Sequence, residues 1–266
     1  MQWGWIQSLI LGMVLGWVFA PRAPEWLRQC GLERKNYLGR SVATAGGVLF
    51  AAGAVLAFFQ RPRVGDLILL LPIGGFALLG LVDDLWGSAE ARGLRGHLLA
   101  LLRRRVTTGT VKLIGGLLLA WWVAGFLSPG LWRLPAAVLI ALCANTINLL
   151  DLRPLRALKG FWVGMLLMPG VADVWQHSSI LPFFAGLTLP YAGEEGRRKV
   201  MLGDTGSNLL GGLLGACAVV LCPWWGQLGA IVALGLFHLW AEKHSLTAWI
   251  ARHSWARWLD ELGAGK

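Results

Sequence analysis

Charged residues are scarce in this chain of 266 residues: Lys, Arg, Asp and Glu together account for 14% of it, and only 14 residues are acidic. Soluble domains average about 25% charged residues, so the composition excludes a water-soluble globular protein. The 56% of hydrophobic residues also excludes an intrinsically disordered chain. A mean hydropathy of +0.60 therefore predicts a protein whose solvent is a lipid bilayer.

Cysteine is nearly as rare, with four residues and no Cys-x-x-Cys or Cys/His spacing. This excludes a disulfide framework and a zinc or thiol redox motif, and we interpret the four thiols as packing residues. The first 20 residues lack the basic start and the Ala-x-Ala site of a secretory signal peptide, so they predict a retained helix.

Long apolar runs are abundant. A membrane-spanning helix needs about 20 apolar residues. Nine runs approach or reach that length, at residues 2–20, 41–59, 66–82, 108–127, 134–150, 160–175, 179–192, 207–222 and 227–241. We therefore predict an all-α, polytopic membrane bundle of about nine transmembrane helices, in a single domain at residues 1–241. Residues 242–266 mix Trp and Leu with charged side chains, which predicts a cytoplasmic amphipathic tail on the inner leaflet, broken near Ser254.

Basic residues are distributed unevenly between the connectors of these runs. Of the 24 Lys and Arg, three lie in one set of alternate connectors and 20 lie in the other, at residues 21–40, 83–107, 151–159, 193–206 and 242–266. Because retained cytoplasmic loops carry the positive charge, we predict an external N-terminus and a cytoplasmic C-terminus in the plasma membrane. Basic loops that face anionic membrane lipids account for the net charge of +10, so no nucleic acid partner is expected.

Three polar segments end at the same predicted depth, where a span meets a cytoplasmic loop. The first is Asp83–Asp84, whose adjacent carboxylates need a cation, a proton or open water. The second, residues 145–151, brings Asn145, Asn148 and Asp151 to the end of one helix. Taken singly, the acid pair also fits a solvated loop end, and the amides also fit a bond to another helix.

The third segment, residues 201–208, combines glycine with an acid at the start of a helix. Its glycines let the backbone approach a ligand closely, and Thr205 or Ser207 is expected to cap the helix. A helix N-terminus attracts anions, so Asp204 there suggests a hard cation that joins it to a phosphate. For the later Gly211-x-x-x-Gly215 we favour helix packing.

Taken together and in this order, the segments make the chain resemble the polyprenyl-phosphate N-acetylhexosamine-1-phosphate transferases, glycosyltransferase family 4. The resemblance covers about residues 36 to 241. The motifs that carry it are Gly39 through Ala45-Gly46-Gly47, Asp83-Asp84, Asn145-x-x-Asn148-x-x-Asp151 and Gly203-Asp204-x-Gly206-Ser207. The chain departs from the family at Pro154, where a second Asp is usual, and at residues 242–245, where a His-rich loop is reduced to His244. Family members commonly have a tenth span as well.

The resemblance implies a Mg²⁺-dependent transferase of bacterial cell-envelope glycan synthesis, with Mn²⁺ as a substitute. Such an enzyme moves a sugar 1-phosphate, expected to be that of an N-acetylhexosamine, from a UDP-sugar to undecaprenyl or another polyprenyl phosphate and releases UMP. Its active site is expected to face the cytoplasm, and relatives tend to form homodimers.

The resemblance also implies roles for individual residues. Asp83, Asp84 and Asp204 are the expected catalytic residues, with Asp204 and Asp84 on the metal. Asp83 is expected to deprotonate or orient the acceptor phosphate, or to form a covalent intermediate. Lys112, in the first turns of a span, either reaches a phosphate or extends to the membrane surface. The full expected substrate-binding set is Asn145, Asn148, Asp151, Lys112, Gly203, Ser207 and His244.

The departures leave other functions open. A catalytically degenerate relative would bind lipid phosphate or act as a scaffold for other envelope enzymes. A transporter fits less well, because the acids gather at one face and not at the middle of the membrane, where coupling sites usually lie.

Overall fold

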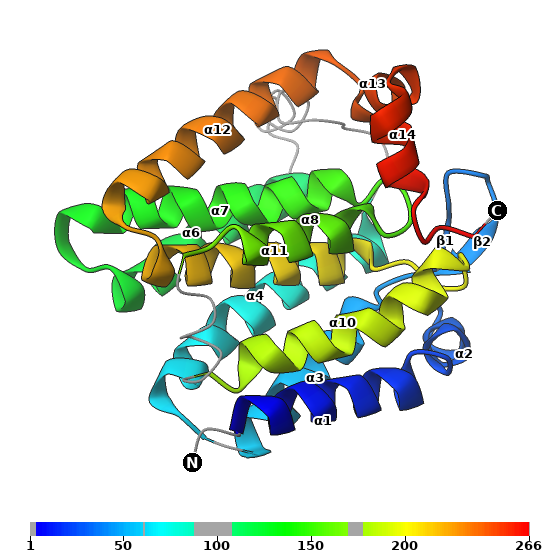
Figure 1. Ribbon diagram of the computed structural model, residues 1–266, viewed down its shortest axis with the longest axis horizontal. Helices are drawn as coiled ribbons and strands as arrows, with labels where there is room; N and C mark the ends of the chain where they lie inside the picture. Colours follow the sequence, from blue (N-terminus) through cyan, green and yellow to red (C-terminus); the bar gives the residue numbers. More distant parts are fainter. Residues whose placement is uncertain (1–3, 61, 88–107, 170–177, 266) are drawn as a thin grey trace.

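A computed structural model of the chain describes residues 4–60, 62–87, 108–169 and 178–265, which form a bundle of helices with one small sheet (Figure 1). The elements are α1 (Gly4–Phe19), α2 (Ala23–Gln29), β1 (Glu33–Lys35), β2 (Ser41–Ala43), α3 (Gly47–Gln60), α4 (Val64–Trp86), α6 (Thr108–Leu127), η1 (Gly130–Trp132), α7 (Arg133–Leu150), α8 (Arg156–Leu166), α10 (Ile180–Gly196), α11 (Gly203–Leu221), α12 (Trp224–Lys243), α13 (Leu246–Arg252) and α14 (Ser254–Glu261).

Each of the nine predicted runs contains a helix, but fewer of these helices have the length and composition of a span. Four segments do: Val64–Trp86, Gly109–Leu127, Gly130–Leu150 and Gly203–Leu221. A fifth is added if α1 and α2, bent by 61° at their junction, are one span. The helices α1, α3, α8 and α10 have 16, 14, 11 and 17 residues, which is short for a bilayer. The chain is a multi-pass membrane protein, whereas nine spans and the sides of the two termini stay predictions.

The all-α prediction is wrong at one place, the run at 41–59. Residues 41–43 form β2, which pairs antiparallel with β1, and the helix begins only at Gly47. Backbone hydrogen bonds explain the difference, because Ala43 also bridges to Val200 and its carbonyl accepts the N–H of Met201. Two of the predicted features, the end of the run at 160–175 and the basic residues between 88 and 107, lie outside the described residues.

The helix α11 lies at the centre of the bundle and is buried along most of its length (Figure 1). It packs against α7 on one side and α4 on another. Gly211 and Gly215 make the first contact close: a Cβ at Gly211 would lie 2.5 Å from the Cα of Ala144, and one at Gly215 would lie 2.6 Å from the Cα of Ile140. The prediction that these glycines serve helix packing is confirmed.

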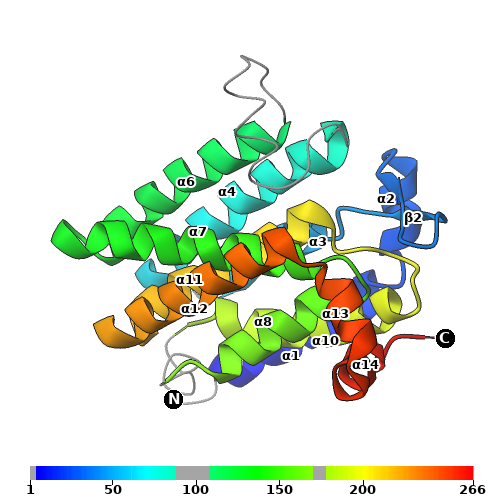
Figure 2. The same cartoon turned by 90° about the horizontal axis from the view of Figure 1, so that it is seen from above.

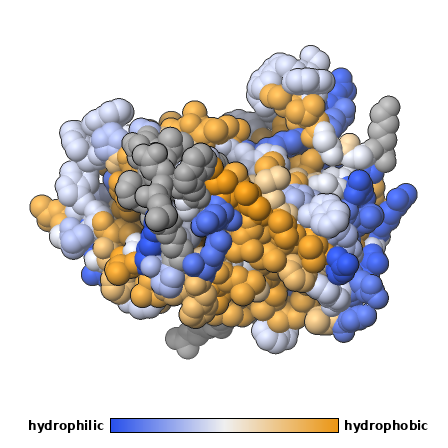
Figure 3. Space-filling view, turned by 60° about the horizontal axis from the view of Figure 1, so that its bottom comes forward, coloured by the Kyte–Doolittle hydropathy of each residue, from blue (hydrophilic) through white to orange (hydrophobic). Residues whose placement is uncertain are grey.

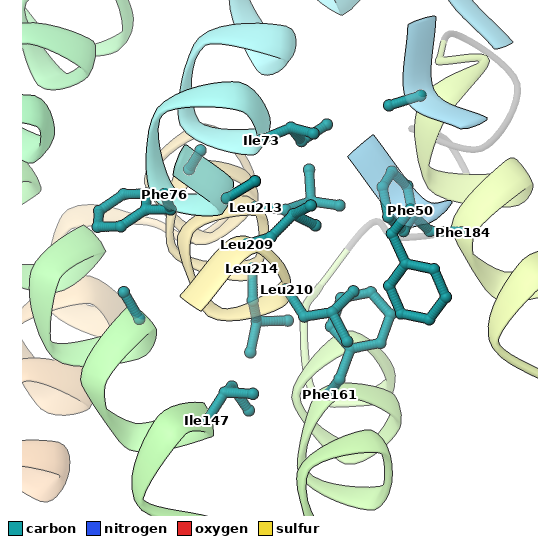
Figure 4. Close-up of a cluster of buried hydrophobic side chains, with 14 of the residues drawn as sticks. Phe50, Ile73, Phe76, Ile147, Phe161, Phe184, Leu209, Leu210, Leu213 and Leu214 are labelled. Atoms are coloured by element: carbon teal, nitrogen blue, oxygen red, sulfur yellow. The ribbon is translucent and has the colours of Figure 1, made fainter. Parts of the chain in front are cut away.

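Apolar side chains fill the space around α11. Leucines of α11 meet residues from five other helices, as Figure 4 shows. The labelled members are Leu209, Leu210, Leu213 and Leu214 of α11, Ile73 and Phe76 of α4, Ile147 of α7, Phe161 of α8, Phe50 of α3 and Phe184 of α10. Much of the outer surface is also hydrophobic, and hydrophilic side chains gather mainly at the end of the bundle near the β hairpin and the C-terminus (Figure 3). Such a surface suits a bilayer.

The tail consists of two short helices, α13 and α14, separated at His253, so the predicted break near Ser254 is confirmed. The tail is fixed to the bundle. Arg156, the first residue of α8, donates to both carboxylate oxygens of Asp260 at 2.6 and 2.7 Å. Lys159 donates to the carbonyl oxygens of Leu259 and Asp260. Figure 2 shows α14 beside the start of α8. Its place on the inner leaflet stays a prediction.

Candidate active site

Four helices bring polar side chains together at one end of the bundle. The acid pair Asp83–Asp84 lies in the last turn of α4, Asn148 lies in the last turn of α7, Asp204 lies in the first turn of α11, and Lys112 lies near the start of α6. They meet because α11 packs against α4 and α7, and α6 packs against both of these helices. Residues from the three sequence segments therefore line one site.

Lys112 is the centre of this cluster. Its Nζ lies 3.1 Å from Oδ1 of Asp204 and 3.7 Å from Oδ2 of Asp83. The side chains are 16%, 26% and 20% exposed for Lys112, Asp204 and Asp83, so the group is mostly shielded from solvent but remains accessible. An ion pair with little water around it is stronger than one at the surface. Lys112 is thus held between two carboxylates, and its predicted role towards a phosphate stays a prediction.

Asn148 connects this cation to α11. The Oγ of Ser207 has one proton, and the carbonyl oxygen of Gly203 accepts it at 2.9 Å. We therefore orient the Asn148 amide so that its nitrogen donates to Ser207 Oγ at 2.9 Å and to Asp204 Oδ1 at 2.5 Å. In this orientation its oxygen accepts from Lys112 Nζ at 3.0 Å. One amide thus fixes both the lysine and the aspartate.

Asp84 caps the start of α11. One of its carboxylate oxygens accepts the N–H and the hydroxyl of Thr205, at 2.8 and 2.6 Å, and the other accepts the N–H of Asp204 at 3.1 Å. The first N–H groups of a helix have no partner inside the helix, and Asp84 satisfies two of them. The prediction that Thr205 or Ser207 caps the helix is wrong: an acid from another helix does so, and the Thr205 hydroxyl donates to that acid.

Glycine is required where α4 meets the start of α11. A Cβ at Gly80 would collide with the carbonyl oxygen of Asp204. Gly203 has φ +72°, and a Cβ there would lie 2.7 Å from both the N of Ala45 and Oδ2 of Asp84. These glycines let the acid-bearing turns of α4 and α11 come into backbone contact.

Asp151, directly after α7, lies behind the cluster. Its carboxylate accepts the N–H of Gly203. Burial raises the pKa of Asp151 well above its ordinary value, and the carboxylates of Glu195, Asp204 and Asp84 raise it further.

Comparison with known proteins shows what the chain is similar to. The chain is 32% identical over 205 residues to a phospho-N-acetylmuramoyl-pentapeptide-transferase of Pelotomaculum thermopropionicum, which covers 66% of this chain and 61% of that protein. It is 30% identical over 242 residues to the protein of the same name from Moorella thermoacetica, covering 81% of this chain and 72% of the relative. A third, from Solidesulfovibrio magneticus, is 28% identical over 288 residues, covering 87% and 75%.

The chain belongs to the phospho-N-acetylmuramoyl-pentapeptide-transferase family. This confirms the resemblance drawn from the polar motifs. No protein-family model matches the chain. The chain spans about three fifths of the length of the first relative and about three quarters of the third.

Two residues of the expected substrate-binding set lie apart from the others. Asn145 is exposed on α7, and within the described part of the chain no hydrogen bond joins it to the cluster. His244, directly after α12, stacks on Trp240 with ring centroids 5.4 Å apart, and its Nδ1 lies 3.1 Å from the Trp240 carbonyl oxygen. The roles of both residues in substrate binding stay predictions.

Two functional candidates were not found from the sequence. Arg34 of β1 donates to the carbonyl oxygens of Asp83, Asp84 and Gly87. It is one of five basic residues in its connector, and its position shows no signal that separates it from the others. Glu195 is buried beside Asp151, and burial raises its pKa to about 8. Its neighbour Glu194, with the same side chain, pairs with Arg197 and Lys199, so the sequence alone cannot tell the two apart.

Proposed function

We propose that the chain is a membrane enzyme that transfers a sugar 1-phosphate from a UDP-sugar to a polyprenyl phosphate and releases UMP. The observation that carries the proposal is the convergence of Asp83, Asp204 and Asn148 on the ammonium of Lys112. The relatives named above are phospho-sugar transferases by name, which supports the reaction class. An N-acetylhexosamine is the sugar that the family resemblance suggests.

The reaction joins two anions. An oxygen of the lipid phosphate attacks the phosphorus that carries the sugar, the bond from this phosphorus to the bridging oxygen breaks, and UMP leaves with that oxygen. Such a transfer needs alignment and charge neutralisation more than it needs covalent chemistry. Lys112 supplies one fixed cation, and the N-terminus of α11 supplies the positive end of a helix dipole.

Magnesium would be held by Asp204 and Asp83. Among the residues that the structure describes, no group of three Asp, Glu, His or Cys side chains has metal-binding geometry. Mg²⁺ usually binds one or two carboxylates together with substrate phosphates and water, so the two acids that face Lys112 fit it. When bound, it supplies neutralisation of the donor diphosphate. Asp84 would support the metal indirectly, because its hydrogen bonds fix the backbone of Asp204.

Asp83 is our candidate for the acceptor side. Its carboxylate lies next to Lys112, where it could take a proton from the lipid phosphate or orient it. Lys112 is then the residue that meets the phosphate charge. On the donor side, Asn148 and Ser207 border Asp204, and Asp151 lies behind Gly203, so these residues would bind the sugar nucleotide.

A cavity next to α7 offers room for the isoprenoid chain of the acceptor. Its volume is about 630 Å³, and α7, α8, α11 and α12 enclose it. It extends from Leu150, at the end of α7 that carries the site, to Cys222 and Pro223 at the far end of α11. Ile147 and Leu150, which line it, flank Asn148 in sequence. An apolar cavity of this volume suits a lipid tail.

The test uses the purified full chain with undecaprenyl phosphate, Mg²⁺ and a panel of UDP-sugars, and it measures the release of UMP. We expect release with at least one UDP-sugar and its loss on addition of EDTA, with recovery on added Mg²⁺. Asp83→Asn and Asp204→Asn should each lower the rate by about a hundredfold or more, as expected for an electrostatic group at the reacting atoms. Glu25→Gln, at an exposed acid on α2, is the matched control and should leave the rate unchanged.

Each contrary result has a distinct meaning. If no donor gives UMP, the proposed function fails and a degenerate lipid-phosphate-binding protein becomes the better description. If UMP is released but both substitutions leave the rate unchanged, the activity is correct and the site is misplaced.

A further inference from the structure

The acid pair at the end of α4 is held from outside the helix by the β hairpin. Arg34, in the middle of β1, donates through Nη2 to the carbonyl oxygen of Asp83 at 2.7 Å and to that of Gly87 at 3.2 Å. Its Nε donates to the carbonyl oxygen of Asp84 at 3.1 Å. A single guanidinium therefore binds three carbonyl oxygens of this helix end.

Helix ends need such partners. The last four carbonyl groups of a helix accept no bond from within it, and the C-terminus carries about half a negative charge from the helix dipole. In α4 this end also carries two carboxylates, Asp83 and Asp84, so negative charge accumulates there. These negative charges repel one another, and a cation bound to the carbonyl oxygens reduces the repulsion.

The guanidinium bonds go to the main chain, and the carboxylates stay available for other partners. Asp83 faces Lys112, and Asp84 accepts its bonds from the first turn of α11. Because Arg34 fixes the peptide groups of both acids, it determines the direction in which each side chain leaves the helix.

The other strand of the hairpin holds the segment that leads to Asp204. The carbonyl oxygen of Ala43, in β2, accepts the N–H of Met201 at 2.8 Å, and the N–H groups of Gly46 and Gly47 donate to Met201 and Leu202. The hairpin thus contacts the end of α4 through β1 and the approach to α11 through β2. The hairpin therefore fixes the position of the end of α4 relative to the start of α11.

We propose that Arg34 is a positioning residue of the active site, which holds Asp83 and Asp84 by their main-chain carbonyl oxygens. The inference rests on the proposed function, because its first readout is UMP release. Displacement of a reacting group by about 1 Å can cost a hundredfold in rate, whereas binding of the two substrates depends on other residues. Loss of Arg34 should therefore act on kcat and not on KM.

The first experiment compares Arg34→Gln and Arg34→Lys with Lys35→Gln, which removes the same charge from an exposed neighbour on the same strand. We expect Arg34→Gln to lower kcat by at least about tenfold with KM for both substrates within about threefold, and Lys35→Gln to behave as wild type. Arg34→Lys should recover part of kcat, because an ammonium group binds fewer of the carbonyl oxygens. A further variant, Arg34→Ala, leaves space for a free guanidinium ion. Guanidinium ion at non-denaturing concentration should raise kcat of Arg34→Ala and leave that of Lys35→Gln unchanged.

The second experiment measures the local stability of the helix end and does not depend on enzymatic activity. Hydrogen exchange at the amides of residues 83–87 should be faster in Arg34→Gln than in wild type or Lys35→Gln. If wild type releases UMP while Arg34→Gln matches Lys35→Gln in kcat and in exchange, the inference is overturned. A fall in kcat with no recovery by Arg34→Lys or guanidinium would also overturn it. If wild type releases no UMP, the proposed function fails, and the exchange experiment still decides whether Arg34 holds this turn.

Discussion

Lys112 and Asp204 form an ion pair of 3.1 Å that joins the start of α6 to the start of α11. Lys112 also lies 3.7 Å from Asp83, so one cation lies between two acids that belong to different helices. This geometry makes Lys112 the most direct probe of the site, because its removal leaves two carboxylates facing each other without a cation.

We expect Lys112→Met to lower the rate of UMP release by about a hundredfold, since it removes a preorganised charge next to the reacting phosphates. Lys112→Arg keeps the charge but spreads it over a planar group, and it should retain an intermediate rate. The measurement is initial velocity at saturating UDP-sugar. A normal rate in Lys112→Met would show that the transfer does not need this cation.

Asp84 should matter for stability as well as for rate. Its carboxylate accepts three hydrogen bonds from Asp204 and Thr205, and Asn at this position can replace only some of them. Loss of a helix cap of this kind costs about 1–2 kcal/mol. We therefore expect Asp84→Asn to lower the midpoint of thermal unfolding in detergent, and Asp83→Asn, which leaves these three bonds to the start of α11 in place, to change it less. Equal midpoints for the two variants would contradict the capping role.

Glu195 should make stability depend on pH. Burial raises its pKa from 4.5 to about 8, so the folded chain binds this proton more tightly than the unfolded chain does. Stability is then highest below the unfolded pKa and falls as pH rises towards 8, with a slope of at most about 1.4 kcal/mol per pH unit from this one group. Thermal unfolding of wild type between pH 5 and 8.5 should show this fall.

Two variants test the assignment. Glu195→Gln should flatten the pH dependence, and Glu194→Gln, at the neighbouring acid paired with Arg197 and Lys199, should leave it unchanged. An unchanged slope in Glu195→Gln would mean that Asp151, whose pKa burial also raises, is the group that titrates.

The tail offers a separate test. Arg156, whose side chain is 7% exposed, binds both oxygens of Asp260, and breaking a buried pair by removing one partner costs about 3–5 kcal/mol. We expect Asp260→Asn to lower stability substantially and Glu261→Gln, at the exposed residue next to it, to have little effect. Equal unfolding midpoints in the two variants would show that the tail does not contribute to the stability of the bundle.

The core helices could be predicted from the length of the apolar runs. The meeting of three polar segments could be predicted because all three lie at ends of runs on the same predicted side of the membrane. Asp83, Asp204 and Asn148 were found because each lies where an apolar run begins or ends. The cap formed by Asp84 could not be predicted, because its partners on α11 follow 120 residues later and no local pattern records the pairing. The same applies to Arg34, whose bonds go to main-chain oxygens that every residue has.

The β hairpin was missed for a related reason. Residues 41–46 are apolar enough to extend a span, but their hydrogen bonds go to β1 and to residues 200–202. Hydropathy measures the preference of a side chain for an apolar solvent over water. It carries no information on the hydrogen-bond partners of the main chain. Hydropathy alone therefore cannot place the start of the helix at Gly47.

Gly80 provides the sharpest steric test of the site. It lies one turn before Asp84 in α4, and a Cβ there would collide with the main-chain carbonyl of Asp204. We expect Gly80→Ala to push α4 away from α11, at a cost of about 1–3 kcal/mol in stability, and to abolish most UMP release, because the two acids separate. Gly74→Ala is the matched control, since no atom lies within 4 Å of a Cβ at that position of the same helix. Alanine favours a helix over glycine by about 1 kcal/mol, so Gly74→Ala should be as active as wild type and no less stable. If Gly80→Ala were equally active, the backbone contact between α4 and α11 would not be needed to hold Asp83 and Asp204 at one site.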